Sequence, residues 1–574
     1  MKKKTVLEAI FIVAFLLLAF GISKNSKPNV AIQEIKLQHE LDENEQAYYT
    51  YKKKKVFLSS ALPWTESGFT KKDADPTSLP EEQFVYKDQE EGRLYYQFKK
   101  AYHFNFFSLL PALAAIVLCF LTREPIVSLT VGAACGAIMI GSYHFPDYTV
   151  AMLAQKSPAK TLVLYLWLLG GLLGIWQRTG ASLAFANFMT EKFVKGPRSA
   201  KLVAWGLGVV FFQGGTISSV LVGTSVKPVA DKENISHEEL SYIVDSTSSP
   251  IASQLAFNAW PGYVQAFIYV PGVAFLATEL DRIDFFFKSV PFCFYAIFAV
   301  LGTFMLSIEK PWFTSKRLKA AMKRSRETGE LDAPDAEPLG VDEFNSVDMP
   351  QDYKPHVSEF LLPLFTLLGV AIGTYIVYDS PDILLAFGLA FALSIIMAVL
   401  KGMEIQETIK AAVGGMKGVL GGSIVLLMAF VTGAVSKEVG AGTYLVEVIG
   451  GDVSYMLLPF ILFIISIIIA FSTGSSWGTY AVVFPLAMPL AWAIANSGAI
   501  PAESAMFFMT ICFACVMDGS VFGDQCSPVS DTTVLSSMST GCDLMDHVRT
   551  QAPQAIFAAA LACITWFICL TFFI

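Results

Sequence analysis

Two short polar segments interrupt apolar stretches of this sequence, and each combines carboxylates and hydroxyls with a proline. The first is DSTSSP at residues 245–250, and the second is GDQCSPVSDTT at residues 523–533. Carboxylate, hydroxyl and backbone carbonyl oxygens are the ligands that hard cations such as Na⁺ and Li⁺ prefer. Neither segment contains the imidazole that is common in zinc and copper sites. Both segments are therefore candidate sites for a small hard cation.

The aspartates are the strongest part of this prediction. An ionised carboxylate within a bilayer is costly and usually marks an ion or proton path, so we predict functional roles for Asp245, Asp524 and Asp531. Single hydroxyls such as Ser218 can instead satisfy backbone carbonyls or allow close helix contacts. Asp518 fits either a functional role or a helix end at the membrane interface.

A third polar stretch, GCDLMDHVRTQ, follows the second segment. We expect its charged residues to form a surface turn or an ion-pair network at the membrane edge. They are Asp543, Asp546, His547 and Arg549.

Residues that end helices lie beside these candidate ligands. Pro250 and Pro528 lack a backbone N–H and should interrupt helices, which frees carbonyl oxygens. Gly215 in FQGGT and Gly474 in FSTGSS allow sharp turns at two further positions. Irregular backbone of this kind survives at membrane depth only where it is buried in protein or faces a water-filled cavity.

We therefore predict one site that is built around these four helix breaks. The predicted ion or substrate ligands are Gln213, Asp245, Ser246, Thr247, Ser249, Thr473, Ser475, Asp524, Ser527, Asp531, Thr532 and Thr533. Asp524, Asp531 and Thr532 are the predicted Na⁺ ligands. The sequence does not show a nucleophile paired with a base, so we predict no enzyme, no catalytic residue and no cofactor apart from transported Na⁺ and H⁺.

The elements that must position this site are membrane helices. The chain has 574 residues, of which 54% are hydrophobic and 16% charged, and its mean hydropathy is +0.53. Apolar stretches of roughly 18 to 23 residues recur, which is the length that crosses a bilayer. These features predict an all-α polytopic protein embedded in a lipid bilayer, and they give no support for a nucleic-acid ligand.

Changes in composition divide the chain into five parts. Residues 1–23 have a basic end and an apolar run, which predicts a signal anchor helix. Residues 24–103 then form an extracytoplasmic cap with some strand character. The first transport repeat covers 104–307, the basic segment 308–357 is a cytoplasmic linker, and 358–574 form the second repeat.

The two repeats match at an offset of about 255 residues. A turn at TREP in the first repeat, residues 122–125, corresponds to DSPD at 379–382 in the second. The glycine segments FQGGT and FSTGSS follow at a similar offset, and SPIAS then matches SPVSD after an insertion. The repeats should enter the membrane from opposite sides, and inverted repeats with broken helices are typical of secondary transporters.

Three segments resemble signature sequences of the NhaC-type sodium/proton antiporters, which belong to the ion transporter superfamily. They are PVADKENISHEELSYIVDSTSSPIASQLAFNAWPGY, STGSSWGTYAVVFPLAMPLA and GDQCSPVSDTTVLSSMSTGCDLMDHVRTQAP. The resemblance covers residues 104–574, whereas 24–103 depart from the short N-terminus usual in that family. It implies re-entrant or broken helices, a transport unit that slides against a scaffold, a homodimer, and a multi-pass location in the bacterial cytoplasmic membrane. It also implies that Na⁺ binds at 246–250 and 526–533.

We therefore expect Na⁺(Li⁺)/H⁺ antiport by alternating access, in which Na⁺ and H⁺ compete for the same carboxylate. The alternative is Na⁺- or H⁺-coupled transport or exchange of an organic acid or amino acid, with Lys227 as a candidate partner for the substrate carboxylate. A channel is a third alternative, but it has no obvious need for two inverted polar segments.

Overall fold

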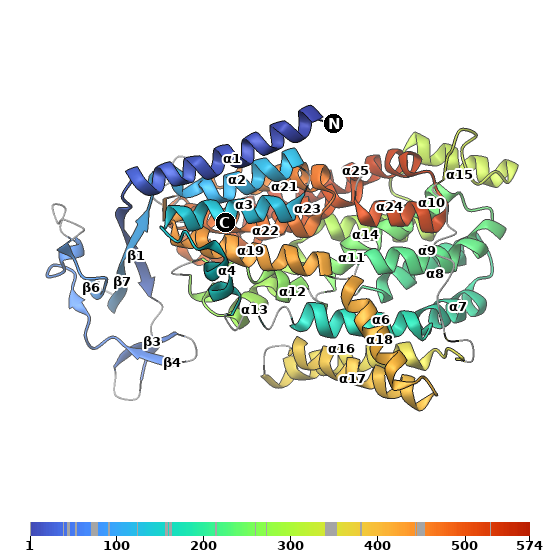
Figure 1. Cartoon of the computed structure of the whole chain (residues 1–574), viewed down its shortest axis with the longest axis horizontal. Coiled ribbons are helices and arrows are strands. Elements are labelled where there is room, and N and C mark those ends of the chain that lie inside the picture. Colours follow the sequence, from blue (N-terminus) through green and yellow to red (C-terminus); the bar gives the residue numbers. More distant parts are fainter. Residues whose placement is uncertain are drawn as a thin grey trace.

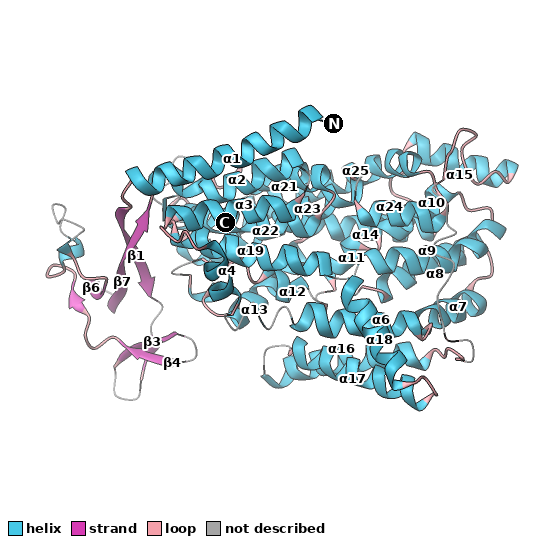
Figure 2. Cartoon of the chain, in the orientation of Figure 1, coloured by secondary structure: helices cyan, strands magenta, loops and turns pink. Residues whose placement is uncertain are grey.

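The protein is a long bundle of helices with a small β-rich region at one end (Figures 1 and 2). A computed structural model describes residues 2–574 except 38–39, 43–45, 52–53, 71–77, 90–91, 123, 155–158, 160–162, 213–214, 256, 259, 271–272, 339–349, 351–352, 379–381, 419, 442, 445–453 and 529. The predicted ligand Gln213, the turn residue Arg123, most of DSPD and part of the predicted linker therefore lie outside the described residues.

Six helices among the described residues are long and apolar enough to cross a membrane. They are α1 (Lys2–Asn25), α16 (Ser358–Tyr378), α17 (Ile383–Leu400), α22 (Ser476–Asn496), α23 (Ala505–Cys526) and α25 (Leu544–Phe573). Two bent helix pairs raise the number to eight if each pair is one span. The pairs are α13 (Glu279–Ser289) with α14 (Phe294–Ser307), and α18 (Ile405–Gly418) with α19 (Leu420–Glu438). The predicted helical, multi-pass architecture is confirmed.

Shorter helices fill the rest of the bundle. They are α2 (Leu110–Thr122), α3 (Pro125–Met139), α4 (Phe145–Leu153), α6 (Gly170–Arg178), α7 (Ala181–Phe193), α8 (Pro197–Val210), α9 (Gly215–Lys232), α10 (His237–Ser246), α11 (Ser249–Gln254), α12 (Trp260–Val264), α15 (Lys316–Thr328), α21 (Leu458–Thr473) and α24 (Asp531–Thr540). Short 3₁₀ turns lie at Gly68–Thr70, Asn105–Leu109, Ala274–Leu276, Val290–Phe292 and Ala502–Ser504, and a π-helical segment covers Val163–Leu169.

At the predicted polar segments, two in each half of the chain, one helix stops and another starts within a few residues. In the first half these are the junctions from α8 to α9 and from α10 to α11. In the second half they are the junctions from α21 to α22 and from α23 to α24. This correspondence is what inverted repeats with broken helices require.

The backbone at these junctions follows the residue types. Gly474 ends α21 with a left-handed φ of +65°, which an L side chain rarely adopts. Pro250 lies in the first turn of α11, where a missing N–H breaks no helical hydrogen bond, so the chain breaks before this proline rather than at it. Pro528 lies in the turn between α23 and α24.

The residues between α1 and α2 form two small antiparallel-rich sheets. One has the order β1-β7-β6-β5, with β1 (Asn29–Leu37), β7 (Gly92–His103), β6 (Glu82–Gln89) and β5 (Leu62–Pro63). The other has β2 (Glu40–Leu41), β3 (Ala47–Tyr51) and β4 (Lys54–Phe57). The sheets and α15 of the predicted linker lie at opposite ends of the bundle (Figure 1). This is the arrangement expected for a cap and a linker on opposite sides of a membrane, although the division into cap, repeats and linker stays a prediction.

The largest apolar core surrounds α22 and α23, and glycines let α23 approach α21 closely. A Cβ at Gly519 would lie 2.5 Å from the carbonyl oxygen of Phe463, and one at Gly523 would lie 2.6 Å from Ala470 Cβ. Small residues allow this backbone contact between membrane helices. The close packing holds the last turn of α23, which contains Asp524, against the end of α21.

Candidate functional site

Asp524 lies at the meeting point of three helix starts. Its side chain is buried at the end of α23, with 3% of its surface exposed. Its Oδ2 accepts hydrogen bonds from the hydroxyls of Ser249 at 3.2 Å and Ser476 at 3.0 Å, and its Oδ1 accepts one from Ser530 at 2.6 Å. Ser249 and Ser476 are the first residues of α11 and α22, and Ser530 immediately precedes α24.

A fourth helix start lies beside these three. Gly215 begins α9, and a Cβ at this glycine would lie 3.0 Å from both Ser249 Oγ and Thr532 Cγ2. The starts of α9, α11 and α24 are therefore in contact, and Ser476 brings the start of α22 to the same carboxylate. Helix starts have unpaired N–H groups and the positive end of the helix dipole, so this region favours negative charge.

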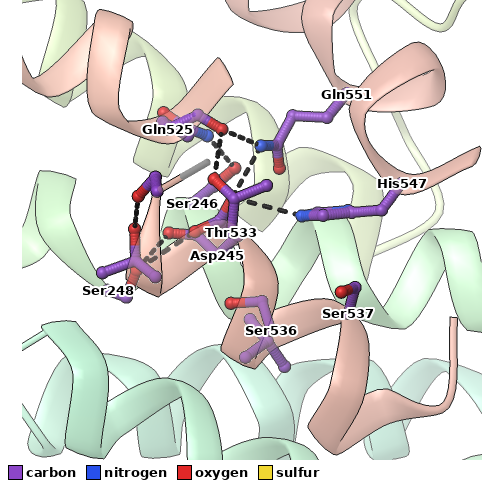
Figure 3. Close-up of polar contacts among 12 residues, drawn as sticks. Asp245, Ser246, Ser248, Gln525, Thr533, Ser536, Ser537, His547 and Gln551 are labelled. Atoms are coloured by element: carbon purple, nitrogen blue, oxygen red, sulfur yellow. Dashed lines mark hydrogen bonds and ion pairs between the residues drawn. The ribbon is translucent and has the colours of Figure 1, made fainter. Parts of the chain in front are cut away.

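Asp245 forms a second polar cluster, with residues of α24 and α25 (Figure 3). Its Oδ2 accepts a 2.6 Å hydrogen bond from Gln551 Nε2 and lies 3.2 Å from His547 Nε2. Thr533 Oγ1 lies 3.5 Å from the same oxygen. The side chains of Asp245 and His547 are both buried, which makes this contact a pairing of two titratable groups inside the bundle.

Gln525 connects the two clusters. It follows Asp524 directly in the chain, and it contacts Ser246 and Gln551 beside Asp245. Its Nε2 donates to Ser246 Oγ at 2.7 Å, and its Oε1 accepts from the hydroxyl of Tyr295 at 2.5 Å. Its backbone carbonyl accepts from Gln551 Nε2 at 2.6 Å and from Thr533 Oγ1 at 3.0 Å. One hydrogen-bonded network therefore joins α10, α14, α23, α24 and α25.

Asp518 supports this network from the interior of α23. Its carboxylate accepts the backbone N–H groups of Tyr295 at 2.7 Å and Ala296 at 3.3 Å, at the start of α14. Asp518 is fully buried and lies within α23, not at a helix end. Its contacts fix the position of Tyr295, whose hydroxyl in turn orients Gln525.

Four predicted ligands are hydrogen-bonded to backbone groups at the helix breaks. The hydroxyls of Thr247, Thr473 and Ser527 donate to the carbonyls of Ile243, Ile469 and Phe471, and Ser475 Oγ accepts the N–H of Gly478. Satisfying backbone groups is the common use of hydroxyls in membrane helices. The observed contacts of these four side chains are thus structural.

The three predicted Na⁺ ligands differ in their surroundings. Asp524 is buried, and Thr532 is buried with its Oγ1 3.0 Å from Ser530 Oγ. Asp531 is exposed at the start of α24, and its Oδ1 accepts the N–H of Thr532. The structure therefore brings Thr532 near Asp524 through Ser530, whereas the Asp531 side chain is exposed but close enough to Asp524 for the two carboxylates to interact electrostatically.

Of the two alternatives predicted for GCDLMDHVRTQ, a surface turn or an ion-pair network at the membrane edge, the surface turn is wrong for His547, which lies within ion-pair distance of Asp245. The His547 side chain is fully buried and faces Asp245, 302 positions earlier in the chain. Sequence reasoning also missed Gln551 and Tyr295, whereas Ser476 and Ser530 lie within the predicted polar segments FSTGSS and GDQCSPVSDTT. A usable signal was present, because His547 and Gln551 are four residues apart and so share one face of a helix.

A separate charged cluster lies where the predicted linker meets the bundle. His237 Nδ1 lies 2.8 Å from Asp332 Oδ1, and its Nε2 lies 3.1 Å from Asp231 Oδ1. Burial lowers the pKa of His237, but its hydrogen bonds to Asp231 and Asp332 outweigh burial and raise the pKa to about 9. Lys227, which we considered as a substrate ligand, pairs with Asp231 at 2.9 Å.

Comparison with known proteins agrees with this architecture. The sequence pattern of the Na⁺/H⁺ antiporter family matches residues 262–569, a range that includes Asp524, His547 and Gln551. An uncharacterized protein of Haemophilus influenzae is 29% identical over 497 residues, which are 80% of this chain and 90% of that protein. The malate-2H⁺/Na⁺-lactate antiporter of Bacillus subtilis is 26% identical over 220 residues, which are 37% of this chain and 42% of that protein.

One solved structure has a similar fold. The YdaH transporter of Alcanivorax borkumensis superimposes with a TM-score of 0.50 and 13% identity, over 75% of this chain and 89% of that one. At this identity the likeness concerns the fold alone.

Proposed function

Since the chain belongs to the Na⁺/H⁺ antiporter family, we propose that this membrane transporter exchanges Na⁺ or Li⁺ for H⁺ and binds the cation at Asp524. The exchange would run by alternating access, with the site open to one side of the membrane at a time. We further propose that the protein resides in the bacterial cytoplasmic membrane, with residues 24–103 outside and the linker inside, and that it forms a homodimer.

The observation that carries this proposal is the set of oxygens around Asp524. Three hydroxyls, from Ser249, Ser476 and Ser530, lie within hydrogen-bond distance of one buried carboxylate. Hydroxyl oxygens have lone pairs, so by turning their hydrogens outward they can ligate a hard cation together with the carboxylate. Among the described residues, no lysine or arginine forms an ion pair with Asp524, so a bound cation or a proton is needed to neutralise it.

The position of Asp524 suits a site that opens to alternate sides. Ser249 belongs to the first half of the chain, whereas Ser476 and Ser530 belong to the second. A cation at Asp524 would be held by both halves at once. Movement of one half relative to the other would therefore open or close the shell of ligands.

Proteoliposomes with an imposed pH gradient test this proposal. Addition of Na⁺ or Li⁺, but not K⁺, should dissipate the gradient in vesicles with the wild-type protein. Asp524→Asn should reduce the rate by about 100-fold, because removing one partner of a buried charged contact costs about 3 kcal/mol. Asp284→Asn is the matched control, since Asp284 is a partly exposed carboxylate on α13 that pairs with Lys288. Transport by Asp524→Asn at the native rate would overturn the assignment.

A second candidate function is Na⁺- or H⁺-coupled exchange of an organic acid or amino acid. The helix starts around Asp524 favour a negative group, and with a cation on Asp524 they could also receive a substrate carboxylate. The Bacillus subtilis relative is named a malate-2H⁺/Na⁺-lactate antiporter. Counter-flow assays with lactate, malate and amino acids decide between the two functions, because Na⁺ uptake stimulated by one of these solutes would favour the second.

A further inference from the structure

The proposed exchange needs a binding place for the proton as well as for the cation, and the bundle contains a second buried carboxylate. Asp245 is fully buried, and its Oδ2 is held by Gln551 at 2.6 Å and by His547 at 3.2 Å. Figure 3 shows His547 and Gln551 approaching Asp245 from α25. Neither of these two side chains contacts Asp524 in the described hydrogen bonds, so this cluster is distinct from the cation site.

His547 can take up a proton without losing its contact to Asp245. Its Nε2 faces the carboxylate, while its Nδ1 is buried and has no hydrogen-bond partner among the described residues. Gln551 Oε1 and Ser536 Oγ are also buried without a hydrogen-bond partner among the described residues. Ser536 lies on α24 in the same part of the bundle (Figure 3). A neutral imidazole with a free ring nitrogen becomes a cation on protonation and then forms an ion pair with the carboxylate.

The two clusters provide two places where a positive charge can neutralise a buried carboxylate. Asp245 and Asp524 are both buried, and among the described residues His547 is the only basic side chain that pairs with either of them. Two uncompensated carboxylates inside a membrane protein are costly. In the exchange the two positive charges alternate, because either a cation at Asp524 or a proton on His547 removes one of the two uncompensated charges.

The two clusters are also mechanically connected. Thr533 Oγ1 lies 3.2 Å from the carbonyl oxygen of Asp524 and 3.5 Å from Asp245 Oδ2. Gln551 Nε2 contacts both Asp245 and the carbonyl of Gln525, the residue next to Asp524. A shift of the turn after α23 on cation binding would therefore change the surroundings of Asp245.

We propose that His547 and Asp245 together form the proton-binding site of the exchange, separate from the cation-binding carboxylate of Asp524. The proton is taken up at His547 Nδ1 on one side of the membrane and leaves from the same atom on the other. This inference rests on the proposed antiport function and replaces the expectation that Na⁺ and H⁺ compete for one carboxylate.

Two transport assays on the same proteoliposomes separate the proton site from the cation site. The first measures ²²Na⁺ self-exchange at equal pH on both sides, which needs cation binding and alternating access but no net proton movement. The second measures Na⁺ uptake driven by a pH gradient. His547→Gln keeps an N–H donor for Asp245 but cannot take up a proton, so we expect self-exchange within about twofold of wild type and a loss of at least about tenfold in gradient-driven uptake.

Two control variants show whether an effect is specific to His547. His144→Gln changes an exposed histidine at the start of α4 and should leave both rates unchanged, whereas Asp524→Asn should reduce both. The inference is overturned if His547→Gln retains gradient-driven uptake at the native rate, which would make His547 a mere hydrogen-bond donor. It is also overturned if His547→Gln loses self-exchange to the same extent. Absence of ²²Na⁺ exchange by the wild-type protein would instead overturn the proposed function, and this inference with it.

Discussion

The hydroxyl of Ser249 donates a hydrogen bond to the carboxylate of Asp524 over 3.2 Å, and the two residues are 275 positions apart in the chain. Ser249 begins α11 after the break in the first half, and Asp524 lies in the last turn of α23 before the break in the second half. The contact therefore ties the two broken helices to each other at the proposed cation site. A substitution at Ser249 should therefore change the affinity for the cation.

Ser249→Ala should weaken Na⁺ binding, because it removes one hydroxyl oxygen from the shell around Asp524. A hydrogen bond to a charged group contributes about 1.5–3 kcal/mol, so the Na⁺ concentration for half-maximal exchange should rise by at least about tenfold. Ser253→Ala is the matched control on the same helix, since Ser253 is also buried but donates to the backbone carbonyl of Pro250. Equal effects of the two substitutions would show that the hydroxyl of Ser249 has no special role.

Gly208→Ala should disturb the end of α10, because α8 packs directly against it. A Cβ at Gly208 would lie 2.0 Å from Thr247 Oγ1 and 2.5 Å from Thr247 Cβ. Thr247 is the C-cap that directly follows α10, two positions after Asp245. Overpacking of this kind costs about 1–3 kcal/mol, so both thermal stability in detergent and the exchange rate should fall.

Gly206→Ala provides the control two residues earlier on α8. A Cβ at Gly206 would meet nothing within 4 Å, and alanine favours the helix over glycine by about 1 kcal/mol. We therefore expect Gly206→Ala to match or exceed the thermal stability of the wild-type protein, with unchanged transport. If both alanine variants lose stability equally, the close contact between Gly208 and Thr247 is not the cause.

Asp518→Asn should separate a structural aspartate from the proposed functional ones. Its carboxylate holds the first N–H groups of α14, and an amide is a weaker acceptor with only one carbonyl oxygen. Loss of part of this cap should lower the free energy of unfolding by about 1–2 kcal/mol. The Na⁺ affinity of the folded protein should stay close to native, since Asp518 makes no described contact with Asp524. A large loss of Na⁺ affinity at unchanged stability would contradict this role.

The sequence was sufficient to predict the helix breaks and the central carboxylate, for local physical reasons. Proline and glycine act on the backbone within a few residues, so the breaks near Gly474 and Pro528 follow from residue type alone. The free-energy cost of an ionised carboxylate in an apolar segment can also be recognised from the local sequence. On this basis Asp524 and Asp245 were predicted to lie inside the bundle, and both are buried.

The partners of these carboxylates could not be predicted, because they depend on how distant helices pack. His547 lies in a stretch with four charged or titratable residues, a composition typical of a surface, and only the packing of α25 against α10 buries it beside Asp245. Asp531 shows the reverse case. It looks equivalent to Asp524 in the sequence, but as the first residue of α24 it has an exposed side chain, and only its charge acts on Asp524.

The contact between the linker and the bundle should depend on pH through His237. The pKa of His237 is raised to about 9 from an ordinary value near 6.5, because its protonated ring is held between Asp231 and Asp332. The raised pKa means that this stabilisation is complete below about pH 6.5 and is lost as the pH rises through about 9, with a total of about 3 kcal/mol. Hydrogen–deuterium exchange over residues 329–338, corrected for the intrinsic pH dependence, should therefore show protection that falls between pH 7 and pH 10. His237→Gln should abolish this dependence, and His144→Gln should preserve it. Asp332→Asn should shift the fall to lower pH, since it removes one of the two groups that raise the pKa. Protection that stays constant up to pH 10 in the wild-type protein would show that the pairing with Asp231 and Asp332 does not hold the linker in place.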